Sequence, residues 1–203
     1  KWLTEIAHKN PIWIHTKDAK RLGVDNGDLL KITTEIGWFV DKVWVTEAIK
    51  PGVVACSHHI GRWRRQQDAG NRFMSNTVDI KNMGDGKWKM ETVSGVEPWE
   101  SNDPDTNRVW WRDGGVHQNI THAANPDPIS GAHCWLQKVS ISKPESGEKY
   151  GDVFVDTNKS FEHYKKWNAW AKEKETHPDG LRRPLWMGRP LTPQKEQFYL
   201  EDK

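Results

Sequence analysis

The sequence has 203 residues, and its 30 Lys and Arg side chains nearly balance 28 Asp and Glu, which gives a formal net charge of +2 at pH 7. A chain of this length can bury one substantial core, so we expect a single domain with appendages. The weak positive charge does not by itself indicate nucleic acid as a partner, and no segment approaches the roughly 18 consecutive apolar residues of a membrane span.

Cysteine and tryptophan usage narrow the class further. Cys56 and Cys134 lie far apart, without the paired spacing of a zinc knot or the density of a disulfide scaffold, and Cys56 is expected to be a buried, inert thiol. Thirteen tryptophans against three tyrosines and five phenylalanines suit surfaces that are apolar on one side and polar on the other, such as ligand walls and interfaces, although any one tryptophan more often fills or covers an ordinary core. The chain opens with Lys1, so we expect a fragment or a processed product, and its compartment stays undecided.

The first predicted elements are a strand and a short helix. Residues 10–15, NPIWIH, have the apolar character of a strand. Thr16 is placed to cap a helix from Lys17 to Leu22, and Gly23 is placed to end it.

Three further strands are predicted before residue 60. Asn26-Gly27 favours a turn, because both residues tolerate positive φ. The turn leads into residues 29–35, then 38–46 and 52–57, which are all rich in apolar residues. Strands this short need neighbours on both sides, which predicts a compact β barrel or sandwich. The residues expected on one face of the first of these strands are Leu30, Ile32 and Thr34.

The middle of the chain alternates long polar connections with short strands. Residues 64–106 are rich in Gly, Asp, Asn and Ser, and within them only 87–93, KWKMETV, is typical of a strand. Strand character returns at 107–111 and at 134–143. The segment between them, DGGVHQNITHAANPDPISG, is typical of a ligand-facing connection.

The carboxy-terminal part changes character after Lys143. SFEHYKKWNAWAKEKE predicts a helix with an aromatic stripe, which we expect to dock on the chain's own barrel or on a neighbouring subunit. The final residues contain several prolines and are expected to run extended over a surface. The stripe consists of Phe161, Tyr164, Trp167 and Trp170.

Three kinds of site compete for residues 52–63, GVVACSHHIGRW. A metal site is disfavoured, because adjacent strand residues point to opposite faces and no HExxH spacing occurs. A catalytic site lacks any nucleophile pattern such as GxSxG. A surface for a flat anion fits more residues, since Gly61 permits close approach and Arg62, Arg64 and Arg65 offer guanidinium donors. A solvated strand end explains the same run equally well.

A longer resemblance bears on this choice. The stretch PIWIHTKDAKRLGVDNGDLLKITTEIGWFVDKVWVTEAIKPGVVACSHHIGRW resembles the carboxy-terminal dinucleotide-binding domain of the molybdopterin oxidoreductases, in the dimethyl-sulfoxide-reductase superfamily. The similarity resumes at GVHQNITHAANPDPISGAHCWLQKVSI, where that family has an asparagine-led loop, an Asp-Pro turn and a last strand. Together the two stretches cover residues 1–63 and 107–143, and their order and spacing make the resemblance specific.

The resemblance implies a mainly β fold, a six-stranded double-psi β barrel with short helices. In that family the barrel closes over a bis(molybdopterin guanine dinucleotide) cofactor, bis-MGD, which other domains of the same enzyme bind and which carries molybdenum or tungsten. The parent enzymes catalyse two-electron redox reactions, often oxygen-atom transfer. Because the metal ligand belongs to other domains, we expect this chain to be non-catalytic in isolation.

The resemblance also implies roles for particular residues. His58, His59, Gly61 and Trp63 match the loop that borders a pterin, and Asn119 matches a loop asparagine that contacts the cofactor. Gln137 or Lys138 falls where relatives often place a lysine. Trp111 falls near a position that faces the substrate funnel in some relatives.

Domain boundaries and partners follow from the same resemblance. We expect a barrel over residues 1–143 with an insertion loop at 64–106, and a carboxy-terminal helix with a docking tail over 144–203. The expected partners are the remaining domains or large subunit of the oxidoreductase and an iron-sulfur electron-transfer subunit, with no nucleic acid and no direct membrane insertion. The alternative function is a non-catalytic, Trp-rich module that binds nucleic acid or glycan through stacking tryptophans.

Overall fold

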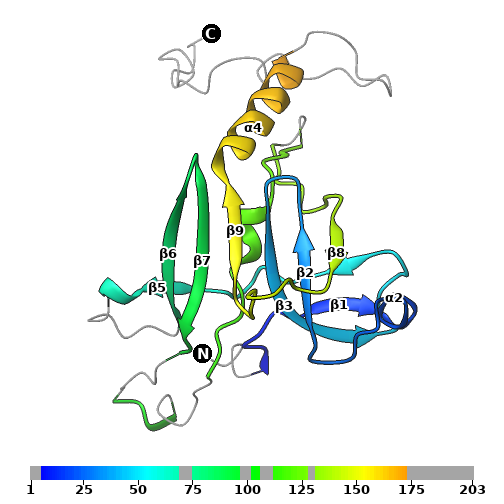
Figure 1. Ribbon diagram of the computed structural model, residues 1–203, viewed down its shortest axis with the longest axis vertical. Helices are drawn as coiled ribbons and strands as arrows, with labels where there is room; N and C mark the ends of the chain where they lie inside the picture. Colours follow the sequence, from blue (N-terminus) through cyan, green and yellow to red (C-terminus); the bar gives the residue numbers. More distant parts are fainter. Residues whose placement is uncertain (1–5, 69–74, 97–101, 106–111, 128–130, 173–203) are drawn as a thin grey trace, which may run out of the picture. The chain divides into compact units, whose positions relative to one another are not determined.

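A computed structural model describes residues 6–68, 75–96, 102–105, 112–127 and 131–172, except for the side chains of residues 170–172 (Figure 1). The chain divides into two compact units. The first unit contains residues 1–123 and 136–160, and the second contains residues 124–135 and 161–203. The predicted strand at 107–111, Trp111, the side chain of Trp170 and the proline-rich tail lie outside the described residues.

The first unit begins with strand β1 (Ile12–His15) and helix α2 (Thr16–Leu22). The helix and its end at Gly23 are confirmed, because Gly23 adopts the left-handed conformation with φ of 64°. The predicted cap is wrong. His15 is the N-cap, and its Nδ1 accepts a hydrogen bond from the Lys17 amide at 3.0 Å. The Thr16 hydroxyl instead donates to the Glu47 carboxylate, so the His15 imidazole caps the helix in place of the Thr16 hydroxyl.

The next strands confirm the predicted elements, with shorter bounds for the first and last and one added residue for the middle strand. They are β2 (Leu29–Thr33), β3 (Gly37–Thr46) and β4 (Val54–Ala55). Strand β1 runs parallel to β3 and antiparallel to β4, while β2 pairs antiparallel with β3. Strand β4 is only two residues long, although GVVACS was expected to form a longer strand.

The region 64–106 is more structured than its composition predicts. Strand β5 (Trp63–Arg65) and the 3₁₀ helix η1 (Gln66–Asp68) are followed by a hairpin of β6 (Asn76–Gly84) and β7 (Lys87–Ser94). The hairpin is the green pair of strands in Figure 1. Strand β7 was predicted and is confirmed. Strand β6 was missed, because a strand with a half-exposed face carries few apolar residues to reveal it.

The tip of this hairpin is fastened to the start of helix α4 (Thr157–Lys172). Thr157 donates to the Gly86 carbonyl from its amide at 2.8 Å and from its hydroxyl at 2.7 Å. Asn158 donates to the Asp85 carbonyl at 2.8 Å. The hairpin turn therefore supplies the first residues of the helix with hydrogen-bond acceptors.

Two short strands complete the first unit, together with the 3₁₀ helix η2 (Gln118–Thr121). Strand β8 (Ser140–Ser142) pairs with β2, so only the end of the predicted strand at 134–143 forms. Strand β9 (Val153–Asp156) was not predicted, and it lies between β3 and β7 in an antiparallel arrangement.

The prediction of a mainly β chain is confirmed, but the six-stranded double-psi barrel is not. The strands of the described residues form one mixed sheet in the order β4-β1-β3-β9-β7-β6-β5, from which β2 and β8 branch at β3. Within the described residues no pairing joins β4 to β5, so the sheet is not closed. The long strand β3 is central, since β1, β2 and β9 all pair with it.

The core of the first unit lies where these strands face one another. Leu30, Ile32 and Thr34 are buried, as the alternation of residues 29–35 predicts. Lys31 is buried as well, because its ammonium group is paired with Glu145 and Glu148 and lies 4.5 Å from the centre of the Trp38 ring. The largest fully buried apolar side chains are Ile12, Ile14, Leu30, Ile36, Val40, Val116 and Val153.

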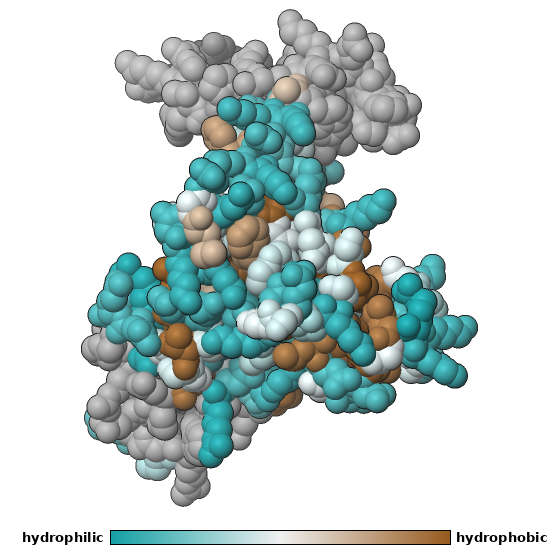
Figure 2. All heavy atoms as spheres, viewed as in Figure 1, coloured by the Kyte–Doolittle hydropathy of each residue, from teal (hydrophilic) through white to brown (hydrophobic). Residues whose placement is uncertain are grey.

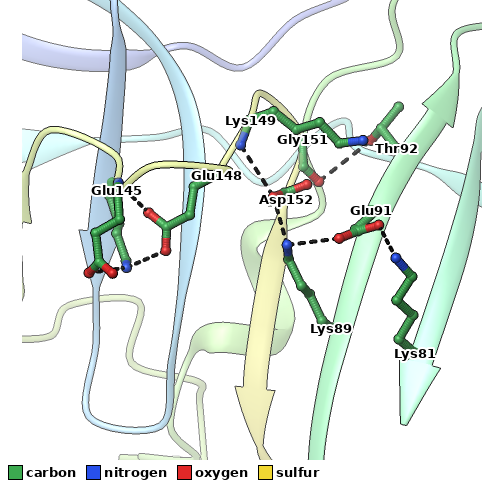
Figure 3. Close-up of polar contacts among 10 residues, drawn as sticks. Lys81, Lys89, Glu91, Thr92, Glu145, Glu148, Lys149, Gly151 and Asp152 are labelled. Atoms are coloured by element: carbon green, nitrogen blue, oxygen red, sulfur yellow. Dashed lines mark hydrogen bonds and ion pairs between the residues drawn. The ribbon is translucent and has the colours of Figure 1, made fainter. Parts of the chain in front are cut away.

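An ionic seam joins β6, β7 and β9 (Figure 3). Lys89 Nζ lies 3.0 Å from Asp152 Oδ2 and 2.8 Å from Glu91 Oε1, and Lys81 pairs with the other oxygen of Glu91. The hydrogen bonds from Lys81 and Lys89 lower the pKa of Glu91 to about 2. Strand β9 is thus held by charged side chains as well as by its backbone.

The described part of the second unit contains a short paired segment and most of α4. Pro126 and His133 form an isolated antiparallel bridge. His163 Nε2 lies 2.7 Å from Asn125 Oδ1, and Trp167 Nε1 donates to the Pro126 carbonyl at 3.1 Å. The helix prediction is confirmed, but the stripe is divided, since Trp167 faces the segment while Phe161 and Tyr164 are exposed.

The surface shown in Figure 2 is mostly hydrophilic, with hydrophobic side chains in small separate areas. Trp44, Trp63, Trp88 and Trp135 are among the large hydrophobic side chains that remain exposed. Among the described residues no helix has the length and apolar character needed to cross a membrane.

Candidate functional site

Two segments far apart in the sequence meet in the first unit. They are the loop that follows β4, residues 56–63, and the segment 113–119 that ends in η2. The Gly61 amide donates to the Gly114 carbonyl at 2.8 Å. Gly61 has φ of 96°, and a Cβ at this position would lie 2.3 Å from the Val116 carbonyl oxygen. Only glycine allows the two segments to approach this closely.

Two buried asparagines hold segment 113–119 in place. The side-chain amide of Asn10 exchanges hydrogen bonds with the backbone of Val116, and that of Asn76 exchanges them with Gly114 and Gly115. Neither residue was singled out from the sequence, because asparagines close to strand starts are also common in ordinary turns. The fold alone shows what they contact.

The predicted residues of the first segment lie on the surface of this junction. His58 and His59 are both exposed. His59 Nδ1 lies 2.6 Å from the Ser57 hydroxyl, and its Nε2 lies 3.1 Å from the Ala7 carbonyl oxygen. Trp63 is 37% exposed and meets the His117 ring edge to face, at 6.2 Å between centroids. An aromatic wall therefore spans the two segments.

Asn119 lies in η2, two residues after His117. Its Oδ1 is buried and has no hydrogen-bond partner within the described part of the chain. The preceding Gln118 donates from Nε2 to the Ser57 carbonyl at 3.0 Å, which ties η2 to the first segment. Burial lowers the pKa of His117, so its imidazole is neutral at neutral pH.

Other predicted residues are not brought to this junction by any contact. Gln137 is half-buried and Lys138 is exposed, and both precede β8. Neither side chain has a hydrogen bond or an ion pair with another described residue. Trp111 lies outside the described residues.

The three arginines expected to bind an anion differ in their surroundings. Arg64 is buried and donates from Nε to the Thr77 hydroxyl at 3.1 Å. Arg65 donates to both oxygens of Asp68. Arg62 is exposed, so the run contributes fewer available guanidinium groups than its sequence indicates.

His59 also lines an open cavity of about 380 Å³. Trp13 and Trp44 form one of its corners, with ring centroids 4.5 Å apart and planes at 76°. Its size is at the lower end of the range for small-molecule sites. The lining is mostly apolar and consists of Ile6, Ala7, His8, Lys9, Asn10, Pro11, Trp13, Trp44, Ser57 and His59.

The titratable groups beneath the junction do not form a reactive centre. Burial raises the pKa of the Cys56 thiol, which donates to the Asn10 carbonyl, in agreement with the inert thiol predicted. Burial also raises the pKa of Asp41 well above its usual value. Among the described residues, no group of three or more His, Cys, Asp or Glu side chains could hold a metal ion. What the junction does present is an aromatic pair, Trp63 and His117, and buried side-chain amides.

Comparisons with known proteins match part of the chain to a family. Residues 1–87 match the family described as Molydopterin dinucleotide binding domain. The recognition made from the sequence is confirmed by this match over residues 1–87.

Three curated relatives illustrate the similarity. A selenate reductase subunit of Mesobacillus selenatarsenatis is 37% identical over 68 residues, 27% of this chain. A tetrathionate reductase subunit of Archaeoglobus fulgidus is 32% identical over 62 residues, 30% of this chain. The molybdopterin-containing subunit of the arsenate respiratory reductase of Chrysiogenes arsenatis is 35% identical over 51 residues, 25% of this chain. The matched stretch covers 6% of the length of each relative.

Proposed function

We propose that this chain is the part of a molybdopterin oxidoreductase that covers a bound molybdopterin guanine dinucleotide. The observation that carries the proposal is the meeting of residues 56–63 and 113–119, with Asn119 Oδ1 buried and unpartnered among the described residues. The family match over residues 1–87 supports the same cofactor class.

The residues present fit such a cofactor. Pterin rings carry N–H groups along their edges, and a buried amide oxygen without a partner is a fitting acceptor for one of them. Trp63 and His117 offer flat faces, and His117 lies two residues before Asn119. His58, His59 and Gly61 complete the border of the same surface, and Gln137 or Lys138 would reach the cofactor from the segment before β8.

When bound, the cofactor supplies a molybdenum or tungsten centre capable of two-electron redox chemistry, including oxygen-atom transfer. The role of this chain is to orient the cofactor and exclude water from its edge. Asn119 accepts a hydrogen bond from the ring, while the backbone of the 56–63 loop and Arg62 border its polar substituents. Trp111 would lie toward the substrate funnel.

The proposal includes the finer fold and the partners. In the assembled enzyme the described sheet belongs to a double-psi barrel that closes over bis-MGD held by other domains. The selenate and tetrathionate reductase relatives are each one subunit of their enzyme, which supports a large-subunit context for this chain. An iron-sulfur electron-transfer subunit is the proposed further partner, and the exposed Phe161 and Tyr164 of α4 are available for contact with another protein surface.

The test is cofactor content in the native protein that carries this chain. We expect molybdenum or tungsten and an oxidised pterin fluorophore to co-purify with the wild type, at about two pterins per metal atom as bis-MGD requires. Asn119→Ala should lower the retained pterin by about tenfold, since a buried hydrogen bond is lost. Asn82→Ala is the control, because Asn82 is exposed on the hairpin. Wild-type protein without pterin, or an Asn119→Ala variant with full pterin, would overturn the proposal.

A further inference from the structure

We propose that Asn10 and Asn76 are positioning residues, whose side-chain amides replace absent strand neighbours for residues 114–116 and so fix Asn119 against the 56–63 loop. The inference rests on the proposed function and assigns it two residues outside both loops. We call this pair the asparagine clamp.

The first half of the clamp comes from the residues before β1. Asn10 is 2% exposed, and its Oδ1 accepts a hydrogen bond from the Val116 amide at 2.8 Å. Its Nδ2 donates to the Val116 carbonyl at 2.9 Å. Both backbone groups of Val116 are therefore satisfied by one side chain 106 residues away in the sequence.

The second half comes from the first residue of β6. Asn76 is 3% exposed, and its Oδ1 accepts from the Gly114 amide at 2.9 Å. Its Nδ2 donates to the Gly115 carbonyl at 2.8 Å. The two asparagines bind neighbouring peptide groups, so the segment is held through its main chain and not through its side chains.

An amide side chain suits this task for a chemical reason. Asparagine carries one carbonyl and one NH₂ group, the same donor and acceptor types that a neighbouring strand would present. Buried backbone groups must find partners, and residues 114–116 belong to no strand in the described structure. Without the clamp, several buried N–H and C=O groups would lose their hydrogen bonds.

The glycines of the segment make room for the clamp. A Cβ at Gly115 would lie 2.5 Å from Asn10 Oδ1, and Gly115 has φ of 78°. A Cβ at Gly114 would lie 3.3 Å from Asn76 Oδ1. The Gly-Gly pair therefore serves close approach by the asparagine amides.

The clamp also reaches the first loop. Asn10 Nδ2 donates to the Ser57 carbonyl at 2.9 Å, and Gln118 Nε2 donates to the same oxygen at 3.0 Å. One side chain thus holds both segments of the site, and the fixed backbone of residues 114–116 leads directly into His117, Gln118 and Asn119. A site held in its binding geometry before the ligand arrives loses less entropy on binding.

The first experiment needs no cofactor. Hydrogen exchange of the wild-type protein should show the amides of Gly114 and Val116 protected, although neither residue lies in a helix or strand. Asn10→Asp keeps the shape and the acceptor but replaces the donor by a carboxylate that faces two carbonyls. It should raise exchange in residues 113–119 by about tenfold or more. Wild-type amides that exchange as fast as free chain would overturn the clamp without any variant.

The second experiment measures how fast pterin dissociates from the full protein. Asn10→Asp and Asn76→Asp should each release it about tenfold faster than wild type at pH 8. Asn82→Asp is the matched control, because Asn82 uses only its Oδ1, as acceptor for the Gly84 amide. Val153→Ala, in the core and outside the loops, controls for a general loss of stability.

The pH profile separates positioning from a structural defect. A buried carboxylate that faces carbonyl oxygens has a raised pKa, and its protonated form can donate again. The ratio of release rates between Asn10→Asp and wild type should therefore fall as the pH is lowered from 8 to 5. The other groups nearby that titrate or carry charge include His8, Lys9, Asp41, Cys56, His59, Asp113 and His117, and their contribution is contained in the wild-type reference.

Each outcome of this experiment decides something. Wild-type protein that holds no pterin would overturn the proposed function and with it this inference. Pterin held by the wild type and released no faster by folded Asn10→Asp or Asn76→Asp would overturn the inference alone. Faster release by Val153→Ala to the same extent would reduce the clamp to a general contribution to stability.

Discussion

The asparagine clamp and the ionic seam are two ways of joining segments that are distant in sequence. The clamp uses neutral amides, is buried, and binds the main chain of residues 114–116. The seam uses Lys81, Lys89, Glu91 and Asp152 and binds strands that already share backbone hydrogen bonds. Neutral amides hold their geometry across pH and salt, whereas ion pairs respond to both. The region proposed to hold a ligand is thus built from contacts that depend little on pH and salt.

The largest loss of stability is expected from a substitution in the ionic seam. Asp152 is fully buried, and Lys89→Met would remove its partner ammonium group and leave the carboxylate without a countercharge. Breaking one side of a buried pair costs about 3 kcal/mol or more of unfolding free energy. Urea titration measures this. A loss below about 1 kcal/mol would mean that the seam adds little to the sheet.

The next effect tests the close approach in the clamped region. Gly61→Ala would place a methyl group 2.3 Å from the Val116 carbonyl oxygen, at φ of 96°. We expect a cost of about 2 to 3 kcal/mol, because the backbone must move or remain strained. Gly52→Ala is the matched control. Gly52 has φ of 79° but nothing within 4 Å of its Cβ, so its cost should be about 1 kcal/mol. Equal losses for the two variants, measured by thermal unfolding, would contradict the contact.

A third prediction concerns pH. The pKa of Glu91 is lowered in the folded protein to about 2 from a usual value of 4.5. Its stabilising contribution is therefore complete above about pH 4.5 and is lost as the pH falls toward 2. Wild type should lose stability over this window more steeply than Glu91→Gln, when both are followed by thermal melts at each pH. Parallel curves for the two proteins would show that Glu91 is not involved.

The smallest loss of stability is expected for Lys81, the more exposed lysine of the ionic seam. The Lys81 side chain is 47% exposed, so Lys81→Met should change the unfolding free energy by less than about 1 kcal/mol. High salt should reduce even this difference, because exposed pairs are screened. If Lys81→Met were as harmful as Lys89→Met in the same urea titrations, burial of the partner would not be the factor that separates them.

The parts of the fold that could be predicted are those encoded locally. Alternating apolar residues predict β2 and β3, and Gly23 marks the end of α2. Strand β6 escaped because its own residues are half polar, and β9 escaped because it is short and pairs with the distant strands β3 and β7. The N-cap was misassigned for a similar reason. The His15 imidazole contacts the carboxylate of Glu47, which follows the end of β3 and is distant from His15 in the sequence.

The residues of the candidate site divide in the same way, into those that a local pattern could predict and those that depend on long-range contacts. The loop residues His58 to Trp63 and Asn119 were predicted through a family resemblance, and the fold brings their two segments together. Asn10, Asn76 and Gln118 were missed because their significance lies in hydrogen bonds to distant backbone groups. A single sequence shows such residues only as polar positions next to strands.

The fastening of the hairpin tip to helix α4 has a consequence for how such chains diversify. The hairpin turn and the start of the helix are far apart in the sequence, yet Gly86 and Asp85 accept hydrogen bonds from Thr157 and Asn158, 71 and 73 residues further along the chain. Shortening the hairpin by one pair of residues would leave the first turn of the helix without these acceptors. A change in the length of the hairpin should therefore be accompanied by a change at the start of the helix. Comparison of related chains that differ in hairpin length would test whether the two segments vary together.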